Sequence, residues 1–241
     1  MNVYWLEQSE KDVPTENDWL STNEIVCLRG LRVDKRRADW RLGRWTAKLA
    51  LSACLDVPAH PQVFRKMEIR PEPSGAPTAF LADQPAAVTI SLSHRAGIAA
   101  CAVAMCYADM GCDIELVEPR SEAFVADYFT FEEQALVART FAADRARLLA
   151  LLWSAKESAL KALREGLRLD TRDLVVRPFS ESSDRNGWSR MLVCCSGGRD
   201  FHGWWQLTNN VLRTMVAAPP PDSPISLTVP AHCFESASQC A

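Results

Sequence analysis

Two segments of the chain repeat one short pattern, and this repeat limits the fold more than any other sequence feature. The segment "WTAKLAL" begins at Trp45, and "WSAKESAL" begins at Trp153. At nearly the same distance after each one, an Arg-Pro pair follows apolar residues, with Arg70 in "EIRP" and Arg177 in "VVRP". Two matches in one register predict a duplicated chain, with halves at 1–108 and 109–241. The alternative is a chance resemblance between two amphipathic helices.

A long helix is predicted over residues 33–56, with Asp34 as its N-cap. One side of this helix is apolar and would pack inward. Another side carries a stripe of basic residues, which a solvated helix face would also explain; the stripe consists of Arg37, Arg41, Arg44 and Lys48.

Further helices and strands are predicted along the rest of the chain. Strands are expected at 87–94 and 97–106, joined by a turn, and again at 112–117. Thr130 and Glu133 have the spacing of a capping box at a helix start. A second helix should run from near Asp144 to a C′ residue at Gly166. Strand-like runs at 173–179, 189–195 and 204–218 precede a tail rich in Pro and Ser at 219–241.

Acidic residues stand out in two apolar segments. On a strand, Asp113 and Glu115 would share one face, and such a pair is tolerated when solvated or when a cation lies between the carboxylates. A solvated edge strand explains them equally well. Glu157 and Lys161 share a helix face, where an ordinary Glu–Lys pair would stabilise by only about 0.2–0.5 kcal/mol.

A third set of polar residues shifts the balance towards a phosphate site. Ser93 and His94 stand at the end of a predicted strand, where a hydroxyl and an imidazole can donate to phosphate oxygens. The arginine stripe offers planar donors that suit the same oxygens. Mg²⁺ prefers carboxylate oxygens together with substrate phosphates. Together these groups predict a site that handles a polyphosphate.

The motifs resemble those of phosphopantetheinyl transferases of the Sfp type. "GCDIELVEP" is similar to the G-x-D-x-E signature of that family, and "LWSAKESALK", about forty residues later, to its W-x-x-K-E-x-x-x-K signature. "SLSH", "YFTFEEQ" and "KRRADWRLGRWTAK" resemble the serine–histidine strand, a helix start and the basic helix of the family. The matches run in family order from about Lys35 to Leu169.

The resemblance implies a fold and an activity. The fold is an α+β fold of two similar halves related by a pseudo-twofold axis, with the site between them. The activity is Mg²⁺-dependent transfer of 4′-phosphopantetheine from coenzyme A (CoA) to a serine of an apo acyl or peptidyl carrier protein. The other product is adenosine 3′,5′-bisphosphate.

The resemblance also implies roles for individual residues. The Mg²⁺ ligands would be Asp113, Glu115 and Glu157, and Glu157 would also be the base for the incoming serine. Lys161 would neutralise the CoA diphosphate and join Asp113 and Glu157 as a catalytic residue. Ser93, His94 and Lys48 would meet CoA phosphates. Further CoA-binding residues would be Arg36, Arg37, Arg44 and Lys156.

Two positions depart from the family pattern. Ala76 stands in "GAP" where the family often has a lysine, so one phosphate contact is missing or comes from elsewhere, with Arg44 and Arg95 as candidates. Glu165 stands where a basic residue is frequent. Both departures concern CoA affinity and leave the reaction class unchanged.

Composition narrows the remaining alternatives. The net charge of −3 argues against a nucleic-acid module that would use the face from Arg37 to Lys48. Another Mg²⁺-dependent enzyme on phosphate esters would use the same carboxylates. The nine cysteines form no C-x-x-C pair, and no apolar run is long enough to span a membrane, so we expect a cytoplasmic chain. The cleft would lie within one molecule, so we expect a monomer.

Overall fold

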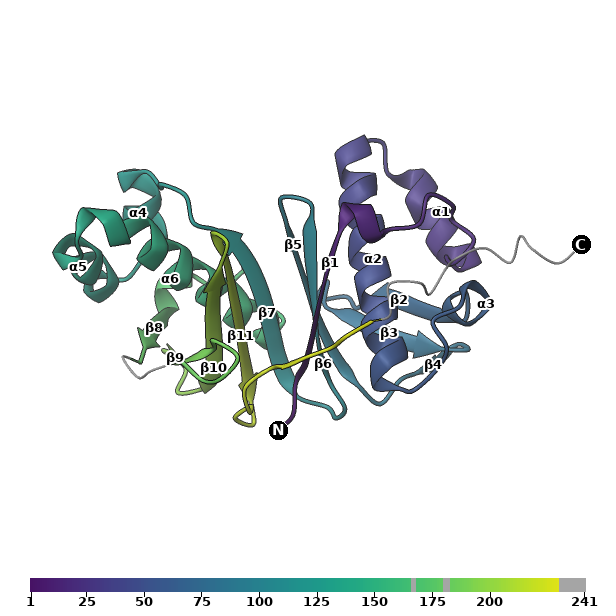
Figure 1. The fold of residues 1–241 in the computed structure, drawn as a ribbon. Helices are drawn as coiled ribbons and strands as arrows, with labels where there is room; N and C mark the ends of the chain where they lie inside the picture. Colours follow the sequence, from purple (N-terminus) through teal and green to yellow (C-terminus); the bar gives the residue numbers. More distant parts are fainter. Residues whose placement is uncertain (166–167, 180–182, 230–241) are drawn as a thin grey trace, which may run out of the picture.

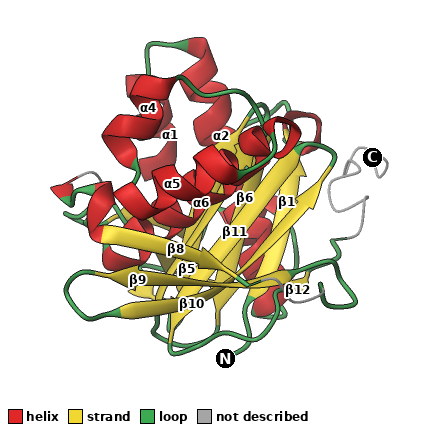
Figure 2. Cartoon of the chain, turned by 90° about the vertical axis from the view of Figure 1, so that its left-hand side faces the viewer, coloured by secondary structure: helices red, strands yellow, loops and turns green. Residues whose placement is uncertain are grey.

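The computed structural model describes residues 1–165, 168–179 and 183–229 as a mixed α+β fold. Two β-sheets face each other in the middle of the molecule, and a long helix covers the outer side of each sheet (Figure 1). Figure 2 looks onto the side that carries the last three helices, which cover one of the two sheets. Among the described residues, no helix combines the length and the apolar character needed to cross a bilayer.

The first part of the chain places three α-helices between its first strand and the others. Its elements are β1 (Tyr4–Ser9), α1 (Thr22–Gly30), α2 (Asp34–Cys54), α3 (Pro61–Phe64), β2 (Met67–Pro71), β3 (Pro77–Leu81), β4 (Gln84–Pro85), β5 (Thr89–Arg95) and β6 (Ile98–Ala104). One sheet has the order β12-β1-β6-β5, in which β12 (Ile225–Ser226) comes from the end of the described chain, and a smaller sheet has the order β2-β3-β4. The predicted strands and turn around Arg95 are confirmed, because β5 and β6 pair antiparallel.

The second part follows a similar sequence of elements. They are β7 (Asp109–Leu116), α4 (Glu122–Tyr128), α5 (Phe131–Arg139), α6 (Ala142–Leu163), β8 (Leu174–Pro178), β9 (Ser189–Cys195), β10 (Asp200–Thr208) and β11 (Val211–Ala218). They form one sheet of order β7-β11-β10-β9-β8. The capping box of Thr130 and Glu133 is confirmed at the start of α5.

Several predicted boundaries differ from the structure. Asp34 is the first helical residue of α2, and Val33, which has no capping group, precedes it. Helix α6 begins at Ala142 and ends at Leu163, where Arg164 takes a left-handed conformation with φ 59°. The predicted C′ residue Gly166 lies outside the described residues. The run 204–218 is a hairpin, because two asparagines with positive φ turn the chain.

Three groups of buried apolar side chains hold these layers together. One lies between α2 and the first sheet and contains Trp45 and Leu49, as the helix pattern predicts. A second lies between α6 and the β7–β11 sheet. The third lies between the two sheets, where Trp5 packs edge-on against Trp188 with ring centroids 5.4 Å apart. Close packing across this last layer fixes the position of β7 against β5.

The end of the described chain returns to the first sheet. Strand β12 (Ile225–Ser226) pairs in parallel with β1, and the amino group of Met1 donates to Asp222 at 3.1 Å. In Figure 1 this yellow-green segment crosses the lower part of the molecule from one sheet to the other. Residues 230–241 of the predicted tail lie outside the described residues.

Candidate functional site

Helix α6 lies directly on strand β7, and Gly111 makes this close approach possible. A Cβ atom at Gly111 would lie 1.9 Å from the carbonyl oxygen of Ser158 and 2.8 Å from the nitrogen of Ala162. No side chain fits into that space, so the crossing requires glycine. The contact brings Glu157 and Lys161 of α6 beside the strand residues that follow Gly111.

Asp113 is buried and accepts three side-chain hydrogen bonds. It is only 7% exposed, and its Oδ1 accepts hydrogen bonds from Ser93 Oγ at 2.7 Å and Lys161 Nζ at 2.9 Å. Its Oδ2 accepts from Ser154 Oγ at 2.8 Å. Burial is the largest single influence and lowers the pKa of Lys161, but the charge and hydrogen bond of Asp113, together with Cys112 and Glu157, raise that pKa overall. Lys161 therefore stays a cation at this position.

Glu115 lies two residues further along β7 and is held by arginines. Its carboxylate is 2.8 Å from Arg95 Nε and 3.3 Å from Arg120 Nη2. Both arginines also reach Glu118, at 2.6 Å and 3.6 Å. Glu115 is thus a buried carboxylate whose charge is balanced by two cations at the rim of the site.

Glu157 completes the group of three carboxylates predicted from the sequence. It is half-buried on α6, and burial raises its pKa, with further raising by the charges of Asp113 and Glu115. Lys161 acts in the opposite direction. Asp113, Glu115 and Lys161 therefore all influence the pKa of Glu157.

The donor types of this group suit a magnesium ion. Mg²⁺ is usually held by one or two carboxylates together with water and substrate phosphates. In the part of the chain that the structure describes, no group of three or more His, Cys, Asp or Glu residues is arranged so that it could hold a metal ion. A Mg²⁺ ion at these carboxylates would need further ligands from water or from a bound phosphate.

Two cavities reach Lys161 and Ser93, the two side chains that bond to Asp113 Oδ1, although none of the three carboxylates lines either cavity. One of about 290 Å³ is lined by Ala76, Lys161 and Arg164, among others. Another of about 390 Å³ is lined by Arg36, Arg44, Ser93 and His94. The cavities share three wall residues, Gly75, Pro77 and Leu92. The cavities are therefore neighbours, one lined by Lys161 and the other by Arg36 and Arg44 of α2.

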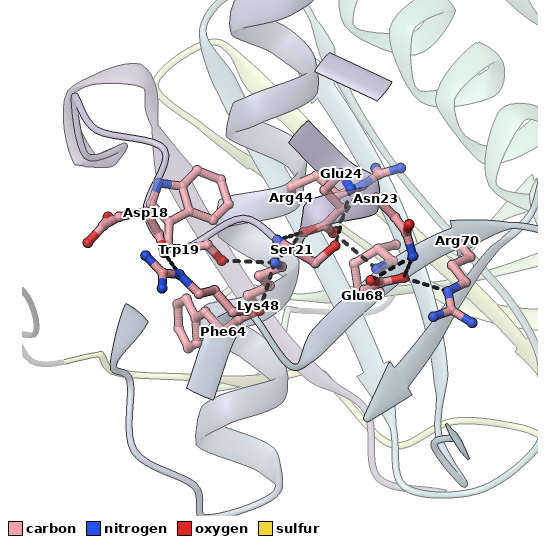
Figure 3. Close-up of polar contacts among 12 residues, drawn as sticks. Asp18, Trp19, Ser21, Asn23, Glu24, Arg44, Lys48, Phe64, Glu68 and Arg70 are labelled. Carbon is pink, nitrogen blue, oxygen red and sulfur yellow. Dashed lines mark hydrogen bonds and ion pairs between the residues drawn. The ribbon is translucent and has the colours of Figure 1, made fainter. Parts of the chain in front are cut away.

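The predicted phosphate contact of Lys48 is wrong. Lys48 is fully buried, and its ammonium group bonds to Glu24 and to the carbonyl oxygens of Trp19 at 3.2 Å and Phe64 at 2.9 Å (Figure 3). All of its donors point into the core, so none is available to a ligand in the cavities.

The three arginines of the basic stripe each lie in a different environment, and only one of them lines a cavity near the site. Arg41 donates to backbone carbonyl oxygens of the loop before α1, including that of Thr15 at 3.1 Å. Arg44 lies 4.7 Å from the ring centre of Trp40 and lines the larger cavity. Arg37 is exposed and lines neither cavity, whereas the neighbouring Arg36 does line one.

The predicted CoA contact of Lys156 is wrong for the same reason. Lys156 is fully buried, 2.8 Å from Glu133, and donates to the carbonyl oxygens of Thr171 and Leu174, both at 2.7 Å. The side chain lines neither of the two cavities beside the carboxylates. Lys156 is a structural residue of the second half.

The two buried lysines have matching partners. Glu24 and Glu133 are each the third residue of a helix that begins with a capping box, with Ser21 and Thr130 as the caps. Each glutamate also accepts a backbone N–H from a strand, from Ile69 at 3.2 Å and from Val176 at 3.0 Å. Both strand residues directly precede the Arg-Pro pairs of the sequence repeat, so the repeat in sequence corresponds to a repeat in bonding.

Other residues of the site were not predicted from the sequence. They are Ser154 and Thr214, which are fully buried, and Arg120 and Arg164, which lie at the rim. Ser154 stands in the repeated segment, one helix turn before Ser158. This spacing places both hydroxyl groups on one helix face, and it could have identified Ser154 from the sequence. Thr214 is paired with Asp113 only through the register of β7 and β11, which local sequence does not specify.

Comparison with known proteins gives one family match. Residues 109–207 match the model of the 4′-phosphopantetheinyl transferase superfamily. The matched segment is under half of the chain and contains Asp113, Glu115, Glu157 and Lys161. A search of curated proteins gave no significant match. The family match supports a transferase with phosphopantetheine transfer as its general chemistry.

Proposed function

We propose that this chain is an Sfp-type phosphopantetheinyl transferase that moves 4′-phosphopantetheine from CoA to a serine of an apo carrier protein. The observation that carries the proposal is the ion pair of Lys161 with Asp113, at 2.9 Å, with Glu115 on the same strand as Asp113 and Glu157 on the same helix as Lys161. Lys161 also lines one of the two cavities, and Arg36 and Arg44 line the other. These are the groups needed to bind a diphosphate and deprotonate a hydroxyl. The segment that matches the superfamily model contains the three carboxylates and Lys161.

The second part of the proposal is that the halves 1–108 and 109–241 descend from one duplicated unit and are related by a pseudo-twofold axis. The matching ion pairs of Glu24 with Lys48 and of Glu133 with Lys156 support it. The order β7-β11-β10 in one sheet corresponds to the order β1-β6-β5 in the other, and the equivalent pairs are all antiparallel. The substrate cavity would then lie between the two units.

In the proposed binding mode, CoA occupies the two adjoining cavities. Arg36, Arg44 and His94 line the cavity that would receive the 3′-phosphate end, where guanidinium groups suit phosphate oxygens. Ser93 and Lys161 lie where the diphosphate would approach Asp113. Arg164 lines the same cavity as Ala76 and would supply the contact that a lysine at that position makes in the family.

Asp113, Glu115 and Glu157 would hold Mg²⁺, which when bound neutralises charge on the diphosphate. Lys161 would also neutralise charge on the diphosphate, because its ammonium group pairs with Asp113 and the residue lines the cavity. Binding of a metal and a diphosphate would require Lys161 to exchange Asp113 for a phosphate oxygen. A cation of this kind stabilises a transferring phosphoryl group without forming a covalent bond to it.

The proposed reaction is a single displacement at phosphorus. The serine oxygen of the carrier protein forms a bond to the phosphorus that carries pantetheine, and the bond from that phosphorus to the bridging oxygen breaks. The bridging oxygen leaves with the electron pair as part of adenosine 3′,5′-bisphosphate. The serine proton passes to Glu157, whose raised pKa makes it a stronger base than an exposed glutamate.

The test is direct. The protein is incubated with CoA, Mg²⁺ and an apo carrier protein, and the carrier is analysed by intact-mass spectrometry. We expect a phosphopantetheine adduct on the carrier serine, and none when that serine is replaced by alanine. Hydrolysis of CoA or of other phosphate esters, without an adduct, would instead favour a different phosphoester enzyme. The cytoplasmic location and monomeric state remain expectations that fractionation and light scattering would test.

A further inference from the structure

A chain of buried hydroxyl groups connects Asp113 to a strand outside the predicted site. Ser154 Oγ is 2.8 Å from Asp113 Oδ2 and 2.8 Å from Thr214 Oγ1. Thr214 Oγ1 is also 2.8 Å from Ser158 Oγ. All three hydroxyl-bearing residues, Ser154, Ser158 and Thr214, are completely buried. We call this set the hydroxyl chain.

The direction of each bond in the hydroxyl chain follows from counting hydrogens. A carboxylate only accepts, so Ser154 must donate its single hydrogen to Asp113. The hydrogen between Ser154 and Thr214 must then come from Thr214. Because the only hydroxyl hydrogen of Thr214 is donated to Ser154, Thr214 Oγ1 can only accept a hydrogen bond from Ser158. The bonds therefore all run one way and end on Asp113.

The matching residue of the first half shows what Ser154 would do without this partner. Thr46 follows Trp45 in "WTAK" as Ser154 follows Trp153 in "WSAK". Thr46 Oγ1 donates to the carbonyl oxygen of Leu42 at 2.8 Å, which is the usual bond of a buried helical hydroxyl. Ser154 has the equivalent carbonyl one turn before it but donates to Asp113 instead.

We propose that Ser154 and Thr214 are positioning residues that hold the Asp113 carboxylate in the orientation required by its metal and diphosphate ligands. Thr214 turns the Ser154 hydrogen away from the helix backbone, and Ser154 then fixes Oδ2 while Ser93 fixes Oδ1. The inference rests on the proposed function of Asp113. Residues that bond to metal-binding carboxylates typically affect metal affinity 10- to 100-fold.

The experiment measures CoA binding by titration calorimetry at a series of Mg²⁺ concentrations, together with thermal unfolding. Thr214→Val preserves the shape of the side chain and removes its hydroxyl. We expect the Mg²⁺ concentration for half-maximal CoA binding to rise about 10- to 100-fold. Thr214→Ser restores the hydroxyl and should restore wild-type binding. Thr46→Val is the matched control, because it removes a buried hydroxyl that does not bond to a carboxylate.

The outcomes separate this inference from the proposed function. If the wild-type protein binds CoA in a Mg²⁺-dependent way and Thr214→Val binds equally well, the positioning role is refuted and the proposed function stands. If Thr214→Val and Thr46→Val lose stability alike and neither changes the Mg²⁺ requirement, the hydroxyl chain is structural only. If the wild-type protein shows no such binding, both proposals fail. Ser154→Ala, with the same expectation, replaces Thr214→Val if that variant does not fold.

Discussion

The ammonium nitrogen of Lys156 lies 2.8 Å from Oε2 of Glu133, and solvent reaches neither group. The pair joins α6 to the start of α5, and its remaining bonds reach the backbone of η3 (Thr171–Asp173) and of β8. A buried ion pair that loses one partner leaves an uncompensated charge in the core. The pair therefore orders four segments of the second half around one point.

Lys156→Met should destabilise the protein without changing its ligand site. We expect the free energy of unfolding in urea to fall by about 3–5 kcal/mol, because Glu133 is left charged and buried. Glu133→Gln combined with Lys156→Met removes both charges and should recover part of the loss. A Lys156→Met variant of wild-type stability with weakened CoA binding would return this lysine to the ligand site.

Glu157→Gln should fold normally and lose most of its turnover. The amide removes a carboxylate whose pKa is raised by burial and by two neighbouring carboxylates, so the melting temperature should not fall. Loss of a general base typically lowers the rate about 10²- to 10⁴-fold. Carrier modification is followed by mass spectrometry at saturating CoA. Near-wild-type turnover would remove Glu157 from the mechanism.

Asp113→Ala should abolish Mg²⁺-dependent CoA binding. The change removes the acceptor shared by Ser93, Ser154 and Lys161 and one proposed metal ligand. Titration calorimetry with and without Mg²⁺ measures the effect. Asp113→Asn keeps the shape and is the companion variant that separates lost charge from lost packing. An unchanged CoA isotherm in both variants would contradict the proposed metal site.

Gly111→Ala should destabilise the protein severely. The added Cβ would overlap the backbone oxygen of Ser158 at 1.9 Å, so α6 must move away from β7. Overpacking of this kind costs about 1–3 kcal/mol or more. Gly43→Ala is the control, since no atom lies within 4 Å of its added Cβ and alanine favours a helix interior. Equal melting temperatures for the two variants would show that α6 can shift freely.

Arg164→Gln should weaken CoA binding while leaving stability nearly unchanged. Its ion pair with Glu72, at 2.8 Å, is partly exposed and contributes at most about 1 kcal/mol. We expect the KM for CoA to rise and kcat to change little. Ala76→Lys in the Arg164→Gln background should lower KM again, because the new ammonium enters the same cavity. Failure of this rescue would place the missing phosphate contact elsewhere.

Local pattern predicted the parts of the site that depend on one element. Alternation along a strand placed Asp113 and Glu115 on one face, and helical spacing placed Glu157 beside Lys161. Both relations hold in the structure because they depend only on the geometry of a strand or a helix. The capping box at Thr130 was predictable for the same reason.

Pattern failed where the outcome depends on distant partners. The spacing of the basic stripe shows which side of α2 carries Lys48. Whether that side is buried depends on Glu24 and on the segment around Phe64, which pack against it. Lys156 was misjudged in the same way, since Glu133 lies on another helix. Thr214 joins the site only through the register of two strands far apart in sequence.

The chain passes between the two facing sheets twice. It crosses first from β6 to β7 and again from β11 to β12, where Met1 and Asp222 reinforce the second crossing. Two bodies joined at two separate points can rotate about the line through those points, but they cannot slide past each other. The buried layer around Trp5 and Trp188 joins the same two sheets, so any such rotation would also have to disturb that packing.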